Sequence, residues 1–364
     1  MRAALVSARK WYAKYERPFS SISLIGGFVF DAVTLKRVDM FWENFWVVAH
    51  LLIVAVCIVW LNWRENSGGD EANPEKAHFW LVNVMQFFFG GILSTYLVFY
   101  FRSGTIATSW PFLLILAAAF FANESFKRHY ARLTFQVSLF FLAIFSFAIF
   151  LVPILFHALG PRIFLISGGA SVVFILLFIV ILRIVSGERF ALSRKPLYLS
   201  LAGIFAAMNL LYFYNLIPPI PLSLKDGGVY HSLVAMGPGR YTIQYEAPGP
   251  FDFLRLSDRI HLVAGDPLYA YSAVFSPTAL NTDIIHEWQW YDPASGAWVT
   301  KGRILLSVVG GRDGGYRTFS MEPDIAAGAW RVNVLTPRNE VIGRLRFDVT
   351  PVPSEPPLVT DTVD

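Results

Sequence analysis

The sequence predicts a bundle of about six or seven membrane-spanning helices followed by an all-β domain, an immunoglobulin-like antiparallel sandwich. Hydrophobic residues make up 55% of the 364 residues and charged residues only 15%, whereas a soluble globular chain carries about 25% charged residues. Most of the chain therefore cannot face water. After Pro218 the hydrophobic pattern changes from the helical period to the alternation of β-strands. These observations divide the chain into a membrane half and a β half.

A helix needs about 20 apolar residues to cross a bilayer. Six stretches of this kind are Asn44–Asn62, Phe79–Phe101, Thr105–Ala122, Leu133–Phe156, Ile163–Val185 and Leu197–Pro218. A seventh candidate, Phe19–Leu35, is at the short end and contains Asp31. Its alternative interpretation is a re-entrant or interfacial segment.

The distribution of Lys and Arg favours seven crossings over six. With seven crossings and a cytoplasmic N-terminus, 14 basic residues lie on the inner side and 4 on the outer side, whereas six crossings give nine on each side. Basic residues collect on the cytoplasmic side of membrane proteins. The sequence thus predicts a multi-pass protein of the cytoplasmic membrane with its C-terminal half outside the cytoplasm.

Charge also separates the predicted regions. Residues 1–221 carry a net charge of +8 and residues 222–364 a net charge of −4. We expect a basic cytoplasmic N-terminus over 1–18, a transmembrane domain over 19–221, an extracytoplasmic β domain over 222–350 and a disordered tail over 351–364. No cluster of basic residues with exposed aromatics indicates nucleic-acid binding.

Short alternating segments after Pro221 predict strands separated by Gly- and Pro-rich turns. Eight strands are expected: Arg240–Glu246, Ile260–Val263, Leu268–Phe275, Ile284–Tyr291, Arg303–Val309, Gly315–Met321, Trp330–Leu335 and Arg344–Val349. Alternation is clearest in the last two, where Trp330 and Phe347 face one way while Arg331 and Arg346 face the other.

Motifs for catalysis or metal binding do not stand out. The single cysteine, Cys57, lies in an apolar run, and no metal-ligand spacing or nucleophile elbow occurs. We therefore expect no cofactor and no metal, and the sequence leans against an enzyme.

Three stretches of the β half carry a family resemblance: VFSPTALNTDIIHEWQWYD (Val274–Asp292), GGRDGGYRTFS (Gly310–Ser320) and GAWRVNVLTPRNEVIGRLRFDV (Gly328–Val349). They resemble the bacterial domain of unknown function 2914, and the preceding helices look like the membrane portion that often accompanies it. The resemblance implies an architecture, from about Gly26 onward, and no activity. One departure is Asn339, which occupies a turn where such sequences commonly have glycine.

Two clusters in this region are candidate binding sites. His286, Trp288 and Trp290 share one face of a strand, which indicates either a core cluster or an aromatic platform for sugar rings. Arg312 and Arg317 flank glycines and could hold a carboxylate or phosphate, or could be exposed arginines of a hairpin.

Two polar side chains in the membrane half, Asp31 and His50, are functional candidates because ionisable groups in lipid are costly. The alternatives are that Asp31 lies near the outer interface and that His50 makes a single interhelical hydrogen bond. We expect the β domain to be a binding or interaction module, with the lipid bilayer and an envelope glycan or membrane protein as partners. A small-solute or proton-coupled transporter using Asp31 and His50 is the alternative function.

Overall fold

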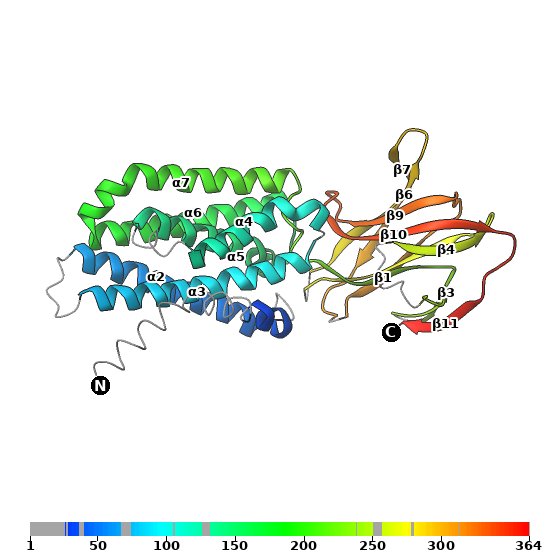
Figure 1. Ribbon diagram of the computed structural model, residues 1–364, viewed down its shortest axis with the longest axis horizontal. Coiled ribbons are helices and arrows are strands. Elements are labelled where there is room, and N and C mark those ends of the chain that lie inside the picture. The colour runs from blue at the N-terminus through cyan, green and yellow to red at the C-terminus, as the bar shows by residue number, and fades with distance from the viewer. Residues whose placement is uncertain are drawn as a thin grey trace, which may run out of the picture. The chain divides into compact units, whose positions relative to one another are not determined.

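The structure is a computed structural model. It describes residues 26, 28–35, 40–66, 74–104, 106–125, 132–237, 239–249, 257–277, 280–312 and 314–363. The chain divides into two compact units, one of helices and one of strands (Figure 1). The β unit takes the chain from Asn215 onward and also includes the short segments Phe101–Trp110 and Phe156–Gly160. The predicted N-terminus 1–18 lies outside the described residues.

The helical unit contains six long helices within the described residues. They are α2 (Phe41–Asn66), α3 (Pro74–Arg102), α4 (Ile106–Ser125), α5 (Leu133–Phe156), α6 (Pro161–Val185) and α7 (Gly187–Phe213). Five are long and apolar enough to cross a membrane: α2, α3 over Leu81–Arg102, α5, α6 and α7. The apolar part of α4, Ser109–Phe121, is shorter. Of the predicted segment Phe19–Leu35, the described part is helical over Phe28–Thr34.

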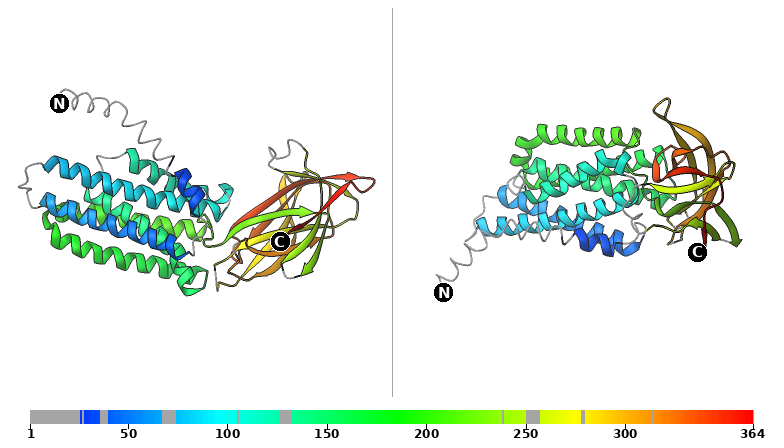
Figure 2. Two further views of the ribbon diagram at one scale, coloured as in Figure 1. Left: turned by 90° about the horizontal axis from the view of Figure 1, so that it is seen from below. Right: turned by 45° about the vertical axis from the view of Figure 1, so that its right-hand side comes forward.

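Helix α5 is the most enclosed helix, and its neighbours run alongside it (Figure 2). Tyr96 and Tyr100 of α3 donate hydrogen bonds to the α5 backbone carbonyls of Ala143 and Ser146, each at 2.8 Å. These bonds satisfy two phenol groups that are fully buried. The α5 sequence is apolar all round, as expected for a helix that packs on every side.

The outward surfaces of α6 and α7 are apolar. Ile184, Leu192 and Leu199 are 79%, 85% and 77% exposed. The transfer of leucine and isoleucine side chains out of water is favourable, so exposed apolar side chains of this kind are compatible with a lipid environment. The five apolar helices are compatible with the predicted multi-pass membrane protein.

Eleven strands form the β unit within the described residues. They are β1 (Ser223–Tyr230), β2 (Ser232–Gly237), β3 (Arg240–Glu246), β4 (Asp258–Val263), β5 (Leu268–Phe275), β6 (Thr282–Asp292), β7 (Ala297–Val308), β8 (Tyr316–Glu322), β9 (Gly328–Leu335), β10 (Val341–Val352) and β11 (Leu358–Val363). Predicted strands at β3 and β5 match the structure to the residue. The sheets have the orders β1-β5-β8, β4-β10-β9-β6-β7 and β11-β3-β2. Every pairing is antiparallel except that of β4 with β10.

The three sheets correct the expectation of a two-sheet sandwich. Strand β5 is buried on both faces: Leu268 and Ala270 join the core of the five-stranded sheet, while Tyr271 and Ala273 pack against the sheet β11-β3-β2. The strands β1 and β2 were not predicted. In the structure β1 pairs with β5, and β2 pairs with β3. Strand β1 contains Lys-Asp-Gly-Gly and β2 has only six residues, and neither shows clear alternation, so the local pattern does not predict them.

The tail is also corrected. Instead of being disordered, Pro351 and Val352 end β10, and β11 pairs with β3 in a register that sets Val359 opposite Tyr245. Val363 packs against the aromatic cluster beneath. Proline and acidic residues predict disorder when a segment is considered alone, but the free edge of β3 provides backbone partners that composition does not show.

Candidate functional site

The predicted aromatic platform lies in the protein core. His286 and Trp288 are both fully buried. The two ring nitrogens of His286 are hydrogen-bonded to the hydroxyls of Ser272 and Ser320, each at 2.8 Å, and Trp288 donates to Ser320 Oγ at 2.9 Å. Burial lowers the pKa of His286 to about 4, so the ring is neutral at pH 7. A ligand platform is therefore wrong for these two residues, and the alternative of a core cluster describes them.

Trp290 lies at the margin of the same core. Its indole is half-buried and donates from Nε1 to the carbonyl of Ala327 at 2.9 Å. The ammonium of Lys301 lies 5.3 Å from the ring centroid. The hydrogen bond of the Trp290 indole and its contact with a cation are therefore both made to residues of this chain.

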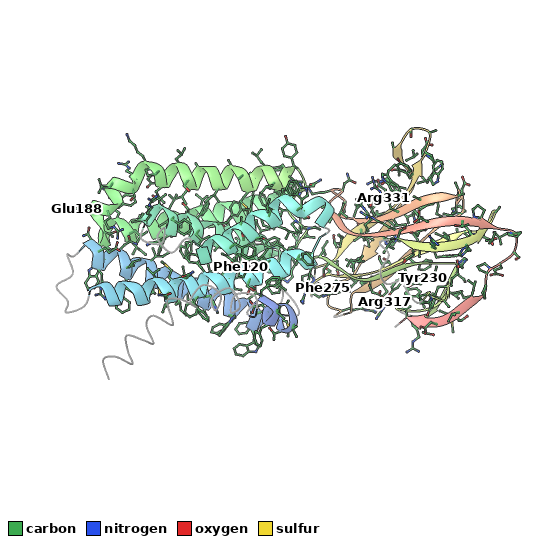
Figure 3. All side chains as sticks on the ribbon, viewed as in Figure 1. Phe120, Glu188, Tyr230, Phe275, Arg317 and Arg331 are labelled. Carbon is green, nitrogen blue, oxygen red and sulfur yellow. The ribbon has the colours of Figure 1, made fainter. Side chains whose placement is uncertain are left out.

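The other predicted pair, Arg312 and Arg317, lies around Tyr241. Burial raises the pKa of Tyr241, and the charges of both arginines act in the opposite direction. Arg312 is exposed and its guanidinium lies 5.4 Å from the ring centroid of Tyr316. Tyr241 donates a hydrogen bond to the Arg317 carbonyl at 3.2 Å. The expected hairpin of exposed arginines is wrong, because the strands before and after this loop, β7 and β8, belong to different sheets. Arg317 lies within β8 and is half-buried, and it is labelled in Figure 3.

A second set of polar residues, missed by the sequence analysis, covers the outer surface of the five-stranded sheet. Strand alternation turns Glu287 and Gln289 to this surface because His286 and Trp288 point into the core. The register then aligns two rows across β10, β9, β6 and β7. One row is Arg346, Arg331, Gln289 and Thr300, and the other is Arg344, Asn333, Glu287 and Arg303. We use the name arginine face for Glu287, Gln289, Arg303, Arg331, Asn333, Arg344 and Arg346.

The carboxylate of Glu287 anchors one row of the arginine face. It accepts hydrogen bonds from Arg303 Nη1 at 2.7 Å and from Asn333 Nδ2 at 3.0 Å. Arg303 also donates from Nη2 to Asn339 Oδ1 at 2.5 Å. Asn339 has a φ of 65°, a backbone conformation that asparagine tolerates better than most residues. It therefore fills the turn where glycine is common and adds an acceptor for Arg303.

Amide oxygens position two further guanidiniums. Arg331 donates from Nε to Gln289 Oε1 at 2.7 Å, and Arg344 donates from Nε to Asn333 Oδ1 at 2.6 Å. The guanidinium of Arg331 also stacks 4.2 Å from the ring centroid of Trp298. Figure 3 labels Arg331, which lies in a different part of the β unit from Arg317. These contacts fix the planes of both guanidiniums.

The charge of the arginine face is not balanced by its own residues. It holds four arginines and one carboxylate, Glu287. Arg346 lies directly opposite Arg331, and its side chain makes no hydrogen bond or ion pair among the described residues. Burial, reinforced by the charges of Arg331 and Arg346, lowers the pKa of Arg344 to about 10. An arrangement of this kind favours the binding of an anion.

Residues 281–349 match the family described as "Protein of unknown function (DUF2914)". The match confirms the resemblance in the C-terminal region, and the apolar helices support the membrane portion that accompanies it. Every residue of the arginine face lies within the DUF2914 region. So do all five β-half residues that the sequence analysis proposed for binding.

Other comparisons give no functional information. No curated protein matches the chain. The β-glucosidase of Listeria innocua in complex with isofagomine is 13% identical over 30% of this chain, with a TM-score of 0.19; the chain spans 16% of that enzyme. The alkylpurine DNA glycosylase AlkC of Pseudomonas fluorescens bound to DNA is 9% identical over 84% of this chain and 98% of its own, with a TM-score of 0.23. Similarity at this level carries no argument about fold or activity.

One carboxylate in the β unit, outside the DUF2914 region, binds two histidines. Glu246 lies 2.6 Å from His261 Nδ1 and 3.2 Å from His231 Nε2, and it accepts the backbone N–H of His261 at 2.6 Å. Burial would raise the pKa of Glu246, but the hydrogen bonds outweigh burial and lower it. In the part of the chain that the structure describes, no group of three or more His, Cys, Asp and Glu residues is arranged to hold a metal ion.

The two intramembrane candidates come together in the helical unit. Ser94 of α3 donates a hydrogen bond to Asp31 Oδ2 at 2.5 Å. His50 of α2 is close enough to Asp31 for their charges to interact, and its Nδ1 lies 2.8 Å from the Trp46 carbonyl. The ring fits because Gly91 has no side chain: a Cβ there would be 3.1 Å from the ring. Sequence periodicity gives no sign of Ser94 as the partner.

Proposed function

We propose that this chain is a bacterial inner-membrane protein that holds a binding module on the outer side of the membrane. The module contacts an envelope polymer or another membrane protein through the arginine face. The observation that carries the proposal is the set of four guanidiniums around one carboxylate, Glu287, in two adjacent cross-strand rows of the sheet. Neighbouring side chains accept hydrogen bonds from three of these guanidiniums, those of Arg303, Arg331 and Arg344, and hold them in place. A cationic surface of this kind is suited to recognition of an acidic partner.

Charge asymmetry supports the orientation. Seven crossings with a cytoplasmic N-terminus give fourteen basic residues on the inner side and four on the outer side. Because basic residues collect on the cytoplasmic side, this asymmetry favours seven crossings and a C-terminal half outside the cytoplasm. The ion pair between Arg189 and Glu65 joins the start of α7 to the end of α2, as expected when α3 to α6 all cross, and it does not depend on the crossing by Phe19–Leu35 or on the orientation. Those two helix ends must share one side if the chain crosses at every helix.

The orientation is tested by fusing reporters after residues 40 and 225. We expect a reporter that is active only outside the cytoplasm to work at both positions. Activity at 225 with none at 40 would contradict six crossings by α2 to α7, because an even number of crossings puts both positions on one side. The crossing by Phe19–Leu35 is tested by a further fusion of the same reporter after residue 18, which should be inactive if this segment crosses. A cytoplasmic reporter active at 225 would overturn the proposed exported module.

The binding role is tested with the intact protein purified from membranes together with its bound material. The comparison is between the unchanged chain, Arg346→Gln, and Arg240→Gln, which removes an equal charge from an exposed position at the start of β3. We expect Arg346→Gln to lose its specific partner material and Arg240→Gln to retain it. Identical material in all three samples would contradict a role for the arginine face.

A small-solute or proton-coupled transporter is the second candidate function. The specific observation in its favour is the cluster of Asp31, Ser94 and His50, which brings an acid, a hydroxyl and an imidazole together between apolar helices. Asp31→Asn should then abolish uptake at normal protein levels, while Thr34→Ser on the same helical segment should leave it intact. Normal uptake by Asp31→Asn would remove this candidate.

A further inference from the structure

The spacing of the arginines indicates a ligand with several acid groups. Arg346 and Arg331 lie on neighbouring strands, which are about 4.8 Å apart. Arg344 lies two residues from Arg346 on the same surface of β10, about 6.6 Å along the strand. One small anion can bridge two of these groups. Acid groups repeated along a polymer can meet all of them.

The orientation of the guanidiniums favours bidentate pairing with a planar acid group or a phosphate; the adjoining aromatic rings favour an acid carried on a sugar. Arg331 and Arg344 each donate from Nε to an amide oxygen of the protein, and their Nη atoms donate no hydrogen bond among the described residues. The two Nη groups of a guanidinium form a planar fork that pairs with both oxygens of a carboxylate. Because the Nε bonds fix the planes, little rotamer entropy is lost when such a pair forms.

Aromatic rings border the same surface. Trp298 lies opposite Tyr291, with ring centroids 5.4 Å apart and planes at 63°. Both rings belong to the outward side of the sheet, and Tyr291 is 37% exposed. Flat rings offer an apolar surface on which a sugar ring can stack. Arg331 lies over Trp298, so a cation and an aromatic ring adjoin at one point.

We propose that the arginine face binds an acidic polysaccharide whose acid groups are sugar carboxylates. This inference rests on the proposed binding function and names its ligand class. The carboxylates pair with Arg331, Arg344 and Arg346, and a sugar ring packs beside Trp298 and Tyr291. Anionic lipid headgroups offer the charge without the sugar ring, and they serve as the contrasting arm of the test.

The test uses the full-length protein in nanodiscs of phosphatidylcholine, which carries no net charge. Binding is measured by calorimetry to polygalacturonate and to the same polymer with its carboxylates methyl-esterified. We expect binding of the free acid only, and weaker binding as salt is raised. Arg331→Gln combined with Arg346→Gln should weaken binding by about tenfold or more. Trp298→Leu should also weaken it, whereas Arg240→Gln should not.

Several results would overturn the inference. Equal binding of the free and esterified polymers would show that carboxylates are not recognised, and unchanged binding by the double arginine variant would place the ligand elsewhere. If polygalacturonate fails to bind while vesicles of phosphatidylglycerol bind in an Arg346-dependent way, the polysaccharide is wrong and the binding function stands. If neither probe binds and Arg346→Gln retains the same material from membranes, both the ligand class and the binding function are wrong. A single cooperative thermal unfolding transition in each variant confirms that its fold is intact.

Discussion

Arg346 on β10 lies directly opposite Arg331 on β9, so that two guanidiniums share one cross-strand position on the outer surface of the five-stranded sheet. Like charges placed opposite each other destabilise an antiparallel pair. Glu287, the one carboxylate of the arginine face, is hydrogen-bonded to Arg303 and Asn333 in the other row. A departure from local stability rules of this kind is expected where a surface has a binding role.

Removing one of these charges should therefore stabilise the protein. For Arg346→Gln we expect the free energy of unfolding to rise by about 0.2–1 kcal/mol, because the repulsion with Arg331 is lost and no bond is broken. Thermal unfolding of the full chain in neutral detergent measures this change. The gain should shrink at high salt. A clear loss of stability would show that Arg346 supports the fold, and Arg240→Gln is the control for a charge removed elsewhere.

Neutralising the central carboxylate should have the opposite effect. Glu287→Gln keeps the shape of the side chain but removes the charge that holds Arg303 and Asn333. We expect a loss of about 1–3 kcal/mol, the range for hydrogen bonds to charged groups and their unpaired partners. Urea unfolding measures it, with Glu355→Gln as a matched change at an exposed position. Equal stability of the two variants would contradict an anchoring role for Glu287.

The buried His286 predicts a pH dependence. Its pKa is lowered by burial to about 4, below the value of about 6.5 expected in the unfolded chain. The unfolded state therefore binds the proton first as pH falls. The contribution of the neutral His286 ring to the free energy of unfolding is therefore complete above pH ~6.5. It decreases as pH falls from ~6.5 to ~4, by up to about 3 kcal/mol in total. His286→Gln should flatten the dependence of unfolding on pH in this window, and an unchanged slope would show that His286 titrates normally.

The C-terminal strand gives a fourth prediction. Deleting residues 358–364 removes β11, exposes the edge of β3 and uncovers the contact of Val363 with the aromatic cluster. We expect a loss of about 1–2 kcal/mol from the apolar contacts and faster proteolysis near Tyr245. Val363→Ala, which keeps the backbone pairing of β11 with β3, should have a smaller effect. If the full deletion leaves stability and proteolysis unchanged, the tail contributes no structure.

Local pattern predicted many of the elements and fewer of the contacts. Five long apolar helices and the bounds of β3 and β5 follow from hydrophobic period and turn residues. Alternation also placed Trp330 inward and Arg331 outward, as the structure has them. The strands β1, β2 and β11 were missed because their sequences show little alternation and depend on partner strands for their pairing.

The candidate site shows the same division. The sequence by itself determined that this chain has a strongly apolar helical half, a β half, and arginines on the outward side of the last strands, because each follows from the spacing of residues close together in the chain. Only the tertiary structure decided that β9 lies between β10 and β6, which brings Arg331 beside both Arg346 and Gln289. It also decided that His286 and Trp288 are enclosed by Ser272 and Ser320 of another sheet. Strand order depends on backbone pairing between segments distant in sequence, and a periodic pattern carries no record of which partner a strand has.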